Sequence, residues 1–121
     1  MEIKKYQIGK NYFEFVCETW ENSRAWGHKV NLFKNGVEIS EAKKTYINRT
    51  WEAYRYQSCM LKAIDILTEE ITENATSKYK SENNIARLTK KHKENIDKIL
   101  ENNEDMQILN ELEKNVKGNI W

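Results

Sequence analysis

The hydrophobic pattern of this chain changes its period once, near Asn48, and that change limits the possible folds more than any other feature. Before it, apolar and polar residues alternate, as they do on a strand with one buried face. After it, apolar residues recur every three or four positions, as they do on one face of a helix. Strands followed by helices predict an α+β fold, with helices on one face of an antiparallel sheet or on a partner molecule.

The first part of the chain is expected to form an antiparallel sheet of about four to five strands. The expected strands cover residues 3–8, 12–18, 28–33, 37–39 and 42–47. Asn35-Gly36 supplies two residues that tolerate positive φ, which predicts a two-residue type I′ hairpin turn. Side chains expected to share a buried face are Phe13, Phe15 and Cys17 on one strand and His28, Val30 and Leu32 on the next.

The second part of the chain is expected to form two or three helices. The first begins after Thr50, a suitable N-cap, and ends near Asn74, where its apolar stripe stops. The second begins after Ser81 or Asn83, and its stripe is Ile85, Leu88, His92, Ile96 and Ile99. The last ends at Gly118. The later stripes are one residue wide, so they favour helix pairing within the chain or between copies, and we expect a homo-oligomer.

Composition limits the domain count and the partners. The 121 residues contain no proline and four glycines, so we expect one domain over 1–121, with the sheet in 1–48 and the helical part in 49–121. Twenty basic and 19 acidic residues give a net charge of +1, which predicts no nucleic-acid partner and no attraction to an anionic membrane. Without a signal-peptide core or a long apolar run, we expect a cytoplasmic protein with no membrane partner.

The segment between the two strongest predicted strands is the first candidate binding site. It contains Trp20, Arg24, Trp26 and His28 within nine residues. An aromatic ring can stack on a nucleobase, and a guanidinium can pair with phosphate oxygens, so the cluster suits a nucleotide ligand. In the alternative interpretation, both tryptophans cap the open end of the sheet and Arg24 stays solvated.

The second candidate site lies where the last strand leads into the first helix. The N-terminus of a helix attracts anions, and Arg49 and Arg55 would add positive charge there, beside Trp51. The alternative is that Trp51 packs the helix on the sheet while Arg49 pairs with Glu52.

Patterns typical of catalysis are missing from the sequence. His28 has no serine or cysteine arranged beside it as a nucleophile, and His92 lies on an apolar stripe. Cys17 and Cys59 form no CxxC motif, so we expect two buried free thiols and no metal site. We therefore expect a protein that is not an enzyme and uses no cofactor.

Residues 12–58 resemble small proteins of bacteriophages and prophages of low-GC Gram-positive bacteria. The similar stretches are Gly27-His28-Lys29-Val30-Asn31-Leu32-Phe33-Lys34-Asn35-Gly36, Ala42-Lys43, and Tyr46-Ile47-Asn48-Arg49-Thr50-Trp51-Glu52 with Tyr54 and Tyr56-Gln57-Ser58. Within that group the chain looks most like the Thoeris anti-defence proteins, which also pair an N-terminal antiparallel sheet with C-terminal helices.

The resemblance implies a protein that binds a cyclic ADP-ribose isomer made by a bacterial TIR enzyme and withholds it from its effector, without breaking a bond. Some members of the family are thought to hold cyclic oligonucleotides as well, at several sites on an oligomer. The ligand-binding residues that we predict rest on side-chain chemistry: they are Trp20, Arg24, Trp26, His28, Arg49, Trp51 and Arg55. The alternative function is a protein-blocking inhibitor of a host defence nuclease, such as an anti-CRISPR, with Trp20 and Trp26 as its anchors.

Overall fold

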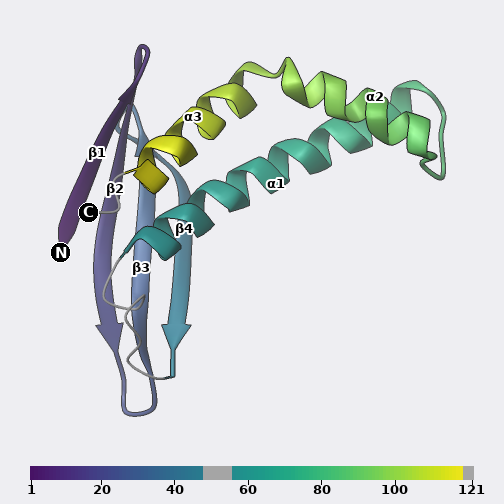
Figure 1. Ribbon diagram of the computed structural model, residues 1–121. Coiled ribbons are helices and arrows are strands. Elements are labelled where there is room, and N and C mark those ends of the chain that lie inside the picture. Colours follow the sequence, from purple (N-terminus) through teal and green to yellow (C-terminus); the bar gives the residue numbers. More distant parts are fainter. Residues whose placement is uncertain (48–55, 119–121) are drawn as a thin grey trace.

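The four strands among the described residues form one antiparallel sheet, and the three described helices follow in sequence, as the α+β prediction expects (Figure 1). The computed structural model describes residues 1–47 and 56–118. The strands lie in the order β1-β2-β3-β4. The elements are β1 (Glu2–Ile8), β2 (Asn11–Glu21), β3 (Trp26–Lys34), β4 (Val37–Tyr46), α1 (Gln57–Glu82), α2 (Lys90–Glu101) and α3 (Glu104–Gly118).

The turn between β3 and β4 is the one that the sequence predicts. Asn35 has φ 51° and Gly36 has φ 85°, so both central residues adopt the positive φ of a type I′ turn. The Asn35 side chain also fixes the turn against β2, because its Oδ1 accepts a hydrogen bond of 2.8 Å from the Tyr12 N–H. The two expected strands at 37–39 and 42–47 are a single strand, β4.

A β-bulge changes the register of this hairpin a few residues from the turn. Next to the turn, Lys34 pairs with Val37 and Phe33 pairs with Glu38, but Leu32 then pairs with Ser40. Ile39 is therefore the extra residue on β4, and every later β4 residue is shifted by one position. Since side chains alternate between faces, this shift determines which β4 side chains lie beside those of β3 on the helix-covered face.

The hydrophobic core lies between one face of the sheet and the helices α1 and α3. The predicted inward residues of β2 and β3 are all buried. Cys59, Ala63 and Ile64 of α1 and Leu112 of α3 meet them. A buried polar contact adds to this interface, because the Ser40 hydroxyl donates a 2.8 Å hydrogen bond to the Ala63 carbonyl. The opposite face of the sheet carries no helix among the described residues (Figure 1).

Three helix boundaries differ from the prediction. The first helix begins at Gln57, with Tyr56 at the N-cap position, instead of directly after Thr50. The first helix continues to Glu82 instead of ending near Asn74, because polar contacts replace the apolar stripe: the Asn95 side chain of α2 donates to the Tyr79 hydroxyl at 3.0 Å. The second helix starts at Lys90 with Thr89 as N-cap, instead of after Ser81 or Asn83. Its cap is reciprocal, because Thr89 and His92 each accept a backbone N–H of the other.

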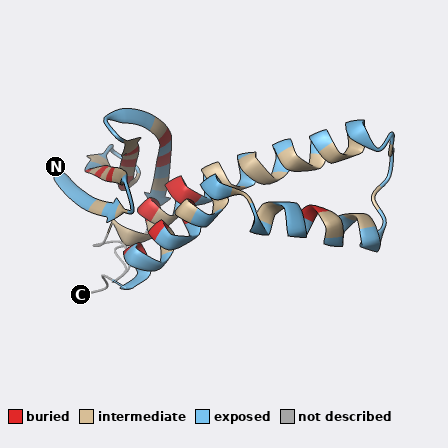
Figure 2. Ribbon diagram, turned by 90° about the horizontal axis from the view of Figure 1, so that it is seen from above, coloured by how far each residue is buried: buried red, intermediate tan, exposed pale blue. Residues whose placement is uncertain are grey.

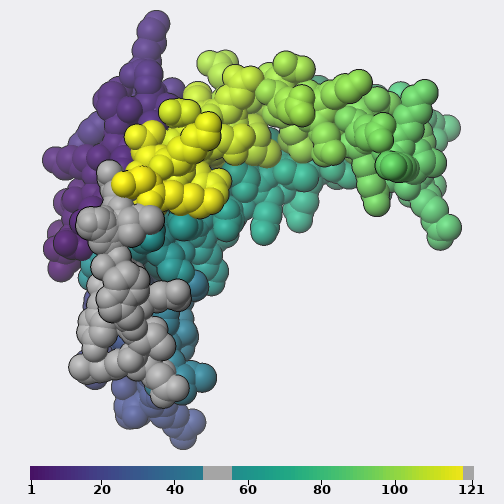
Figure 3. Space-filling model, viewed as in Figure 1, coloured from purple at the N-terminus to yellow at the C-terminus, as the bar shows by residue number. Residues whose placement is uncertain are grey.

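The outer part of α1 and all of α2 project from the sheet as an antiparallel pair (Figures 1 and 2). We call residues 65–105 the helical arm. Few residues of the arm are buried: the last buried residue of α1 is Ile64, just before the arm, and α2 has one buried residue, Ile96. Ile99, which belongs to the predicted apolar stripe of this helix, is 46% exposed. The space-filling view shows the arm extending well beyond the body of the molecule (Figure 3).

Candidate functional site

The β3–β4 register brings aromatic rings together near the β2–β3 loop. Trp26 of β3 pairs with Tyr46 of β4, and the ring centroids lie 5.1 Å apart with an interplanar angle of 42°. His28 lies two residues along the same face, with its ring 5.7 Å from Trp26 and 5.2 Å from Tyr46. Tyr56, just before α1, completes the group at 4.4 Å from His28. We call these four side chains the aromatic cluster.

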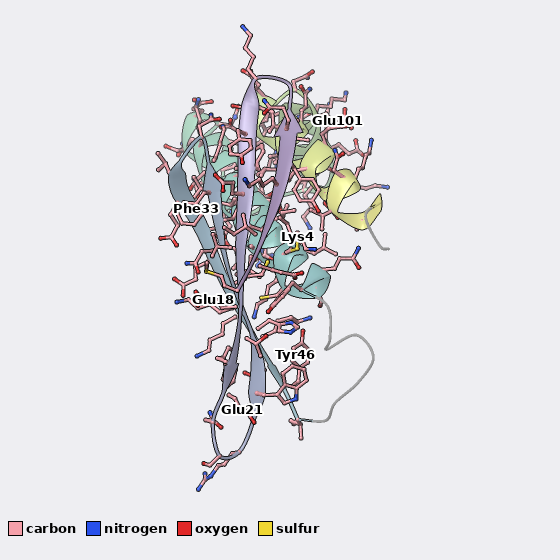
Figure 4. All side chains as sticks on the ribbon, turned by 90° about the vertical axis from the view of Figure 1, so that its left-hand side faces the viewer. Lys4, Glu18, Glu21, Phe33, Tyr46 and Glu101 are labelled. Atoms are coloured by element: carbon pink, nitrogen blue, oxygen red, sulfur yellow. The ribbon has the colours of Figure 1, made fainter. Side chains whose placement is uncertain are left out.

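The cluster lies on the helix-covered side of the sheet, beyond the described beginning of α1. In Figure 4, Tyr46 lies on one side of the lower part of the sheet and Glu18 on the other. His28 forms the buried centre, at 2% exposure, whereas Trp26, Tyr46 and Tyr56 are partly exposed. Trp26, Tyr46 and Tyr56 thus keep part of their side chains accessible, and the face of an aromatic ring is the kind of surface on which a planar base can stack.

Burial gives His28 a defined role in the cluster. The loss of solvent around its ring lowers the pKa of His28, so the imidazole is neutral near pH 7. Its Nδ1 lies 3.4 Å from the Tyr46 hydroxyl, which is a long contact. A neutral, packed His28 holds the neighbouring rings in position and offers a ligand no positive charge.

Polar groups surround the cluster at the beginning of α1. The Tyr56 and Thr19 hydroxyls share a hydrogen bond of 2.8 Å, which connects β2 to the residue before the helix. The Lys44 ammonium donates to the Ser58 hydroxyl, and Lys44 pairs with His28 across the β3–β4 ladder. Glu21 pairs with Trp26 across the β2–β3 ladder. One ammonium and one carboxylate therefore border the aromatic surface.

Trp20 belongs to the other face of the sheet. It pairs with Gly27, whereas Trp26 is the next residue along β3, so the two indoles lie on opposite faces. The Trp20 ring covers Gly27, its Nε1 donates to the His28 carbonyl at 3.3 Å, and the Lys43 ammonium lies 4.5 Å from the ring centroid. One planar ligand therefore cannot stack between Trp20 and Trp26, although the sequence places both in one candidate cluster.

Arg24 lies at the exposed tip of the loop between β2 and β3. The Asn22 side chain shapes this loop, because its Oδ1 accepts hydrogen bonds from the N–H groups of Arg24 and Ala25, at 2.9 and 2.8 Å. Among the described residues, the Arg24 guanidinium forms no ion pair. The loop thus presents a solvated cation at the same end of the sheet as the aromatic cluster.

The second group of candidate residues lies outside the part of the chain that the structure describes. Arg49, Trp51 and Arg55 all fall in 48–55, so their assignment to a ligand site stays a prediction. Tyr46 and Tyr56, which flank that segment, were not selected from the sequence as site residues. Tyr46 belongs to the site because it pairs with Trp26 across the β3–β4 ladder. The position of the turn alone does not predict this pair, because the bulge at Ile39 shifts the register by one residue.

The thiols near the cluster are in their unreactive form. The Cys59 Sγ contacts the Ala42 carbonyl at 3.4 Å and the His28 carbonyl at 3.6 Å, and burial raises the pKa of Cys59. Burial also raises the pKa of Cys17 to about 12. Both are free thiols, as expected. A buried thiol with a raised pKa is a poor nucleophile, so neither cysteine provides covalent chemistry at this site.

Within residues 1–47 and 56–118 there is neither a group of metal ligands nor a membrane-spanning helix. No group of three His, Cys, Asp or Glu side chains there is arranged to hold a metal ion. None of the helices in the described ranges combines the length and apolar character needed to cross a bilayer.

Comparisons of the chain with protein-family models, with curated proteins and with solved structures gave no match. The aromatic cluster, the exposed cation of Arg24 and the two indoles on opposite faces therefore carry the functional argument.

Proposed function

We propose that this protein is a phage anti-defence protein that binds and sequesters a nucleotide signal of the cyclic ADP-ribose class, made by a TIR enzyme. It acts in the cytoplasm of the infected bacterium, breaks no bond and needs no cofactor. The aromatic cluster is the observation that carries the proposal. Its partly exposed rings lie beside a lysine and near a loop that presents an arginine, which suits an adenine linked to a pyrophosphate.

The proposal gives the residues separate roles. Trp26 and Tyr46 stack on the adenine, and His28 and Tyr56 support them from the core side. Arg24 is the first candidate for the phosphates, because it is exposed and forms no ion pair within the described residues. The roles predicted for Arg49, Trp51 and Arg55 extend the same site. Trp20 lies on the other face of the sheet, so it does not contact the ligand. It contributes to the site only by packing on Gly27 and by its hydrogen bond to the His28 carbonyl.

A depletion assay tests this assignment. Lysate that contains the TIR-made signal is incubated with the protein, filtered and applied to the effector, whose activity reports the remaining signal. Trp26→Ala should weaken capture about 5-fold to 150-fold, since stacking contributes about 1–3 kcal/mol per base. Phe33→Ala is the matched control, because Phe33 lies on the same strand but on the opposite face and at the other end.

Two outcomes of this assay would overturn the site assignment. Equal capture by the parent and Trp26→Ala would exclude the aromatic cluster. Loss of capture on Trp20→Ala with full capture by Trp26→Ala would move the site to the opposite face. Arg24→Ala, which keeps the rings intact, should lower capture by removing a charge-assisted contact.

The alternative function is a protein-blocking inhibitor of a host defence nuclease. The half-buried Trp20 ring on the uncovered face of the sheet favours it, because a large aromatic there suits an interface anchor. Heating separates the two functions. A protein that has captured a small molecule releases it intact on denaturation, and the supernatant then activates the effector, whereas a protein-blocking inhibitor releases nothing active.

A further inference from the structure

A hollow lies at the end of the sheet opposite the aromatic cluster, and we call it the sheet-end hollow. It has a volume of about 260 Å³ and is lined by residues of the sheet, α1 and α3. Lys34, the last residue of β3, lines it, whereas Trp26 of the aromatic cluster is the first residue of the same strand. In Figure 4, Phe33, the neighbour of Lys34, lies well above Tyr46 along the sheet. The hollow is therefore separate from the proposed nucleotide site.

The floor of the sheet-end hollow is apolar. Its apolar lining comes from β2, β4, α1 and α3: Phe13, Ile39, Leu67, Ile71, Ile108 and Leu109. Phe13 and Leu109 belong to the buried core, whereas the other four are half-buried and leave part of their side chains accessible. The hollow has room for about nine water molecules at about 30 Å³ each. A small ligand with an aliphatic part would bury that part on this floor, which favours binding.

The β-bulge directs Ile39 into the hollow. Ile39 is the extra residue of β4, and it packs against the hydrophobic core and lines the hollow. Its neighbour Ser40 is also on the helix-covered face, where it donates to the Ala63 carbonyl. In a regular strand, neighbouring side chains alternate, so Ile39 would lie on the uncovered face. Bulges are common next to active sites, where they re-aim a side chain, and this one completes the apolar floor on the β4 side.

Charged side chains of both signs border the floor. Lys34 lies on the sheet side, and Glu70 of α1 and Asp105 of α3 lie on the helix side. Lys34 is half-buried and pairs with the buried Phe13, so it belongs to the helix-covered face. Within the described residues, none of these three charged side chains forms an ion pair. An ammonium and two carboxylates thus border one hollow without contacting each other.

We propose that the sheet-end hollow binds a free aliphatic α-amino acid such as leucine. Its side chain lies on the apolar floor, its carboxylate pairs with Lys34, and its ammonium pairs with Glu70 and Asp105. The charge pattern selects a zwitterion, because an anionic ligand would meet two carboxylates and a cationic ligand would meet the lysine. Size selects a small member of this class, since leucine has about as many non-hydrogen atoms as the hollow can hold water molecules.

An NMR titration of the isotope-labelled full chain with leucine tests the proposal. Leucine should shift the backbone amides of Ile71 and Ile108 until they saturate, and leave those of Trp26 and Tyr46 unchanged. Leucinamide lacks the carboxylate and N-acetylleucine lacks the ammonium, so each should bind about 5-fold or more weakly. Glycine lacks the aliphatic side chain and should bind about 10-fold or more weakly.

Two pairs of variants test the charged contacts. Glu70→Gln should weaken leucine binding about 2-fold to 5-fold, whereas Glu69→Gln should not, because Glu69 is equally exposed but does not line the hollow. Lys34→Gln should weaken it by a similar factor, whereas Lys29→Gln should not, because Lys29 lies on the same strand but on the opposite face. Circular dichroism of each variant shows that a loss of binding is not a loss of fold.

Thermal unfolding gives a second readout. Saturating leucine should raise the midpoint of unfolding of the parent, because a ligand that contacts the sheet, α1 and α3 together binds only the folded chain. Three results would overturn the proposal: no saturable shift with leucine, equal affinities for leucine and either of its derivatives, or parental affinity in both Glu70→Gln and Lys34→Gln. Shifts confined to Trp26 and Tyr46 would also contradict it. Each of these results leaves the nucleotide proposal standing, since the aromatic cluster lies at the other end of β3.

Discussion

Gly27 is the position where the smallest substitution should have the largest effect on the stability of the sheet. A Cβ there would lie 1.9 Å from the Lys44 carbonyl oxygen and 2.7 Å from Cζ2 of Trp20. The carbonyl belongs to the β3–β4 ladder, so it cannot retreat without opening that ladder. Gly27→Ala must therefore displace β4, the Trp20 ring, or both.

The size of the effect follows from the contacts at risk. Overpacking costs about 1–3 kcal/mol. Displacing the indole loses its hydrogen bond to the His28 carbonyl, about 1 kcal/mol, and its contact with the Lys43 ammonium, about 0.5–1 kcal/mol. Replacing a strand glycine returns about 0.5–1 kcal/mol of unfolded-chain entropy. We expect Gly27→Ala to lower the free energy of unfolding by about 2–4 kcal/mol.

Urea denaturation followed by circular dichroism measures this change. Gly118→Ala is the matched control, because a Cβ at Gly118 meets no atom within 4 Å, and it should leave stability unchanged or raise it by up to about 1 kcal/mol. Adding Trp20→Ala to Gly27→Ala should recover only part of the loss, since the clash with the Lys44 carbonyl remains. A Gly27→Ala protein within about 0.5 kcal/mol of the parent would refute the reasoning.

Three further predictions concern buried groups and a helix cap. Because burial lowers the pKa of His28, this side chain takes up a proton in the unfolded chain at a higher pH than in the folded protein. The free energy of unfolding should therefore fall as the pH drops below about 6.5, by up to about 1.4 kcal/mol per pH unit. His28→Phe should remove this pH dependence, whereas His92→Gln should keep it. Cys17 and Cys59 should not react with Ellman's reagent at pH 8 in the native protein, yet both should react in 6 M guanidinium; rapid native labelling would show that they are accessible. Thr89→Ala should remove about 0.5–2 kcal/mol of local stability from α2, because it removes the side chain that caps this helix. The α2 amides should then exchange hydrogen faster, while the β2 amides stay unchanged. Equal exchange of the α2 amides in the parent and in Thr89→Ala would contradict the capping role.

The strands could be predicted because their signals are local. The alternation of apolar residues marks the buried faces of β2 and β3, and Asn35-Gly36 supplies the backbone conformation of its turn. The last helix was also predictable, since Leu109, Leu112 and Val116 repeat at helical spacing and are all buried. In each of these elements, one short stretch of sequence carries the information.

The extent of the first helix and the start of the second were predicted wrongly for a common reason. Beyond Ile64 the arm replaces apolar packing with contacts such as Asn95 to Tyr79, and a polar pattern without period gives no helix signal. Ser81 and Asn83 are suitable caps, but Thr89 has a side chain three residues later, His92, that completes a reciprocal cap. A histidine in that role does not match the usual Glu or Gln.

The candidate site could be predicted only in part. Residue types alone select Trp20, Trp26 and His28, and their faces depend on register. The β2–β3 register together with the alternation of side chains separates the two indoles, because Trp20 pairs with Gly27 and Trp26 is the sequence neighbour of Gly27. Counting back from the turn would pair Trp26 with Thr45; the bulge at Ile39 pairs it with Tyr46 instead and creates the aromatic cluster.

Isothermal titration of cyclic ADP-ribose isomers into the parent protein and into Trp26→Ala tests the central claim most directly. We predict saturable heat for at least one isomer with the parent, and an affinity at least about 5-fold lower for the variant. The absence of heat from every isomer, or equal affinities for the two proteins, would contradict the claim that the aromatic cluster captures a nucleotide.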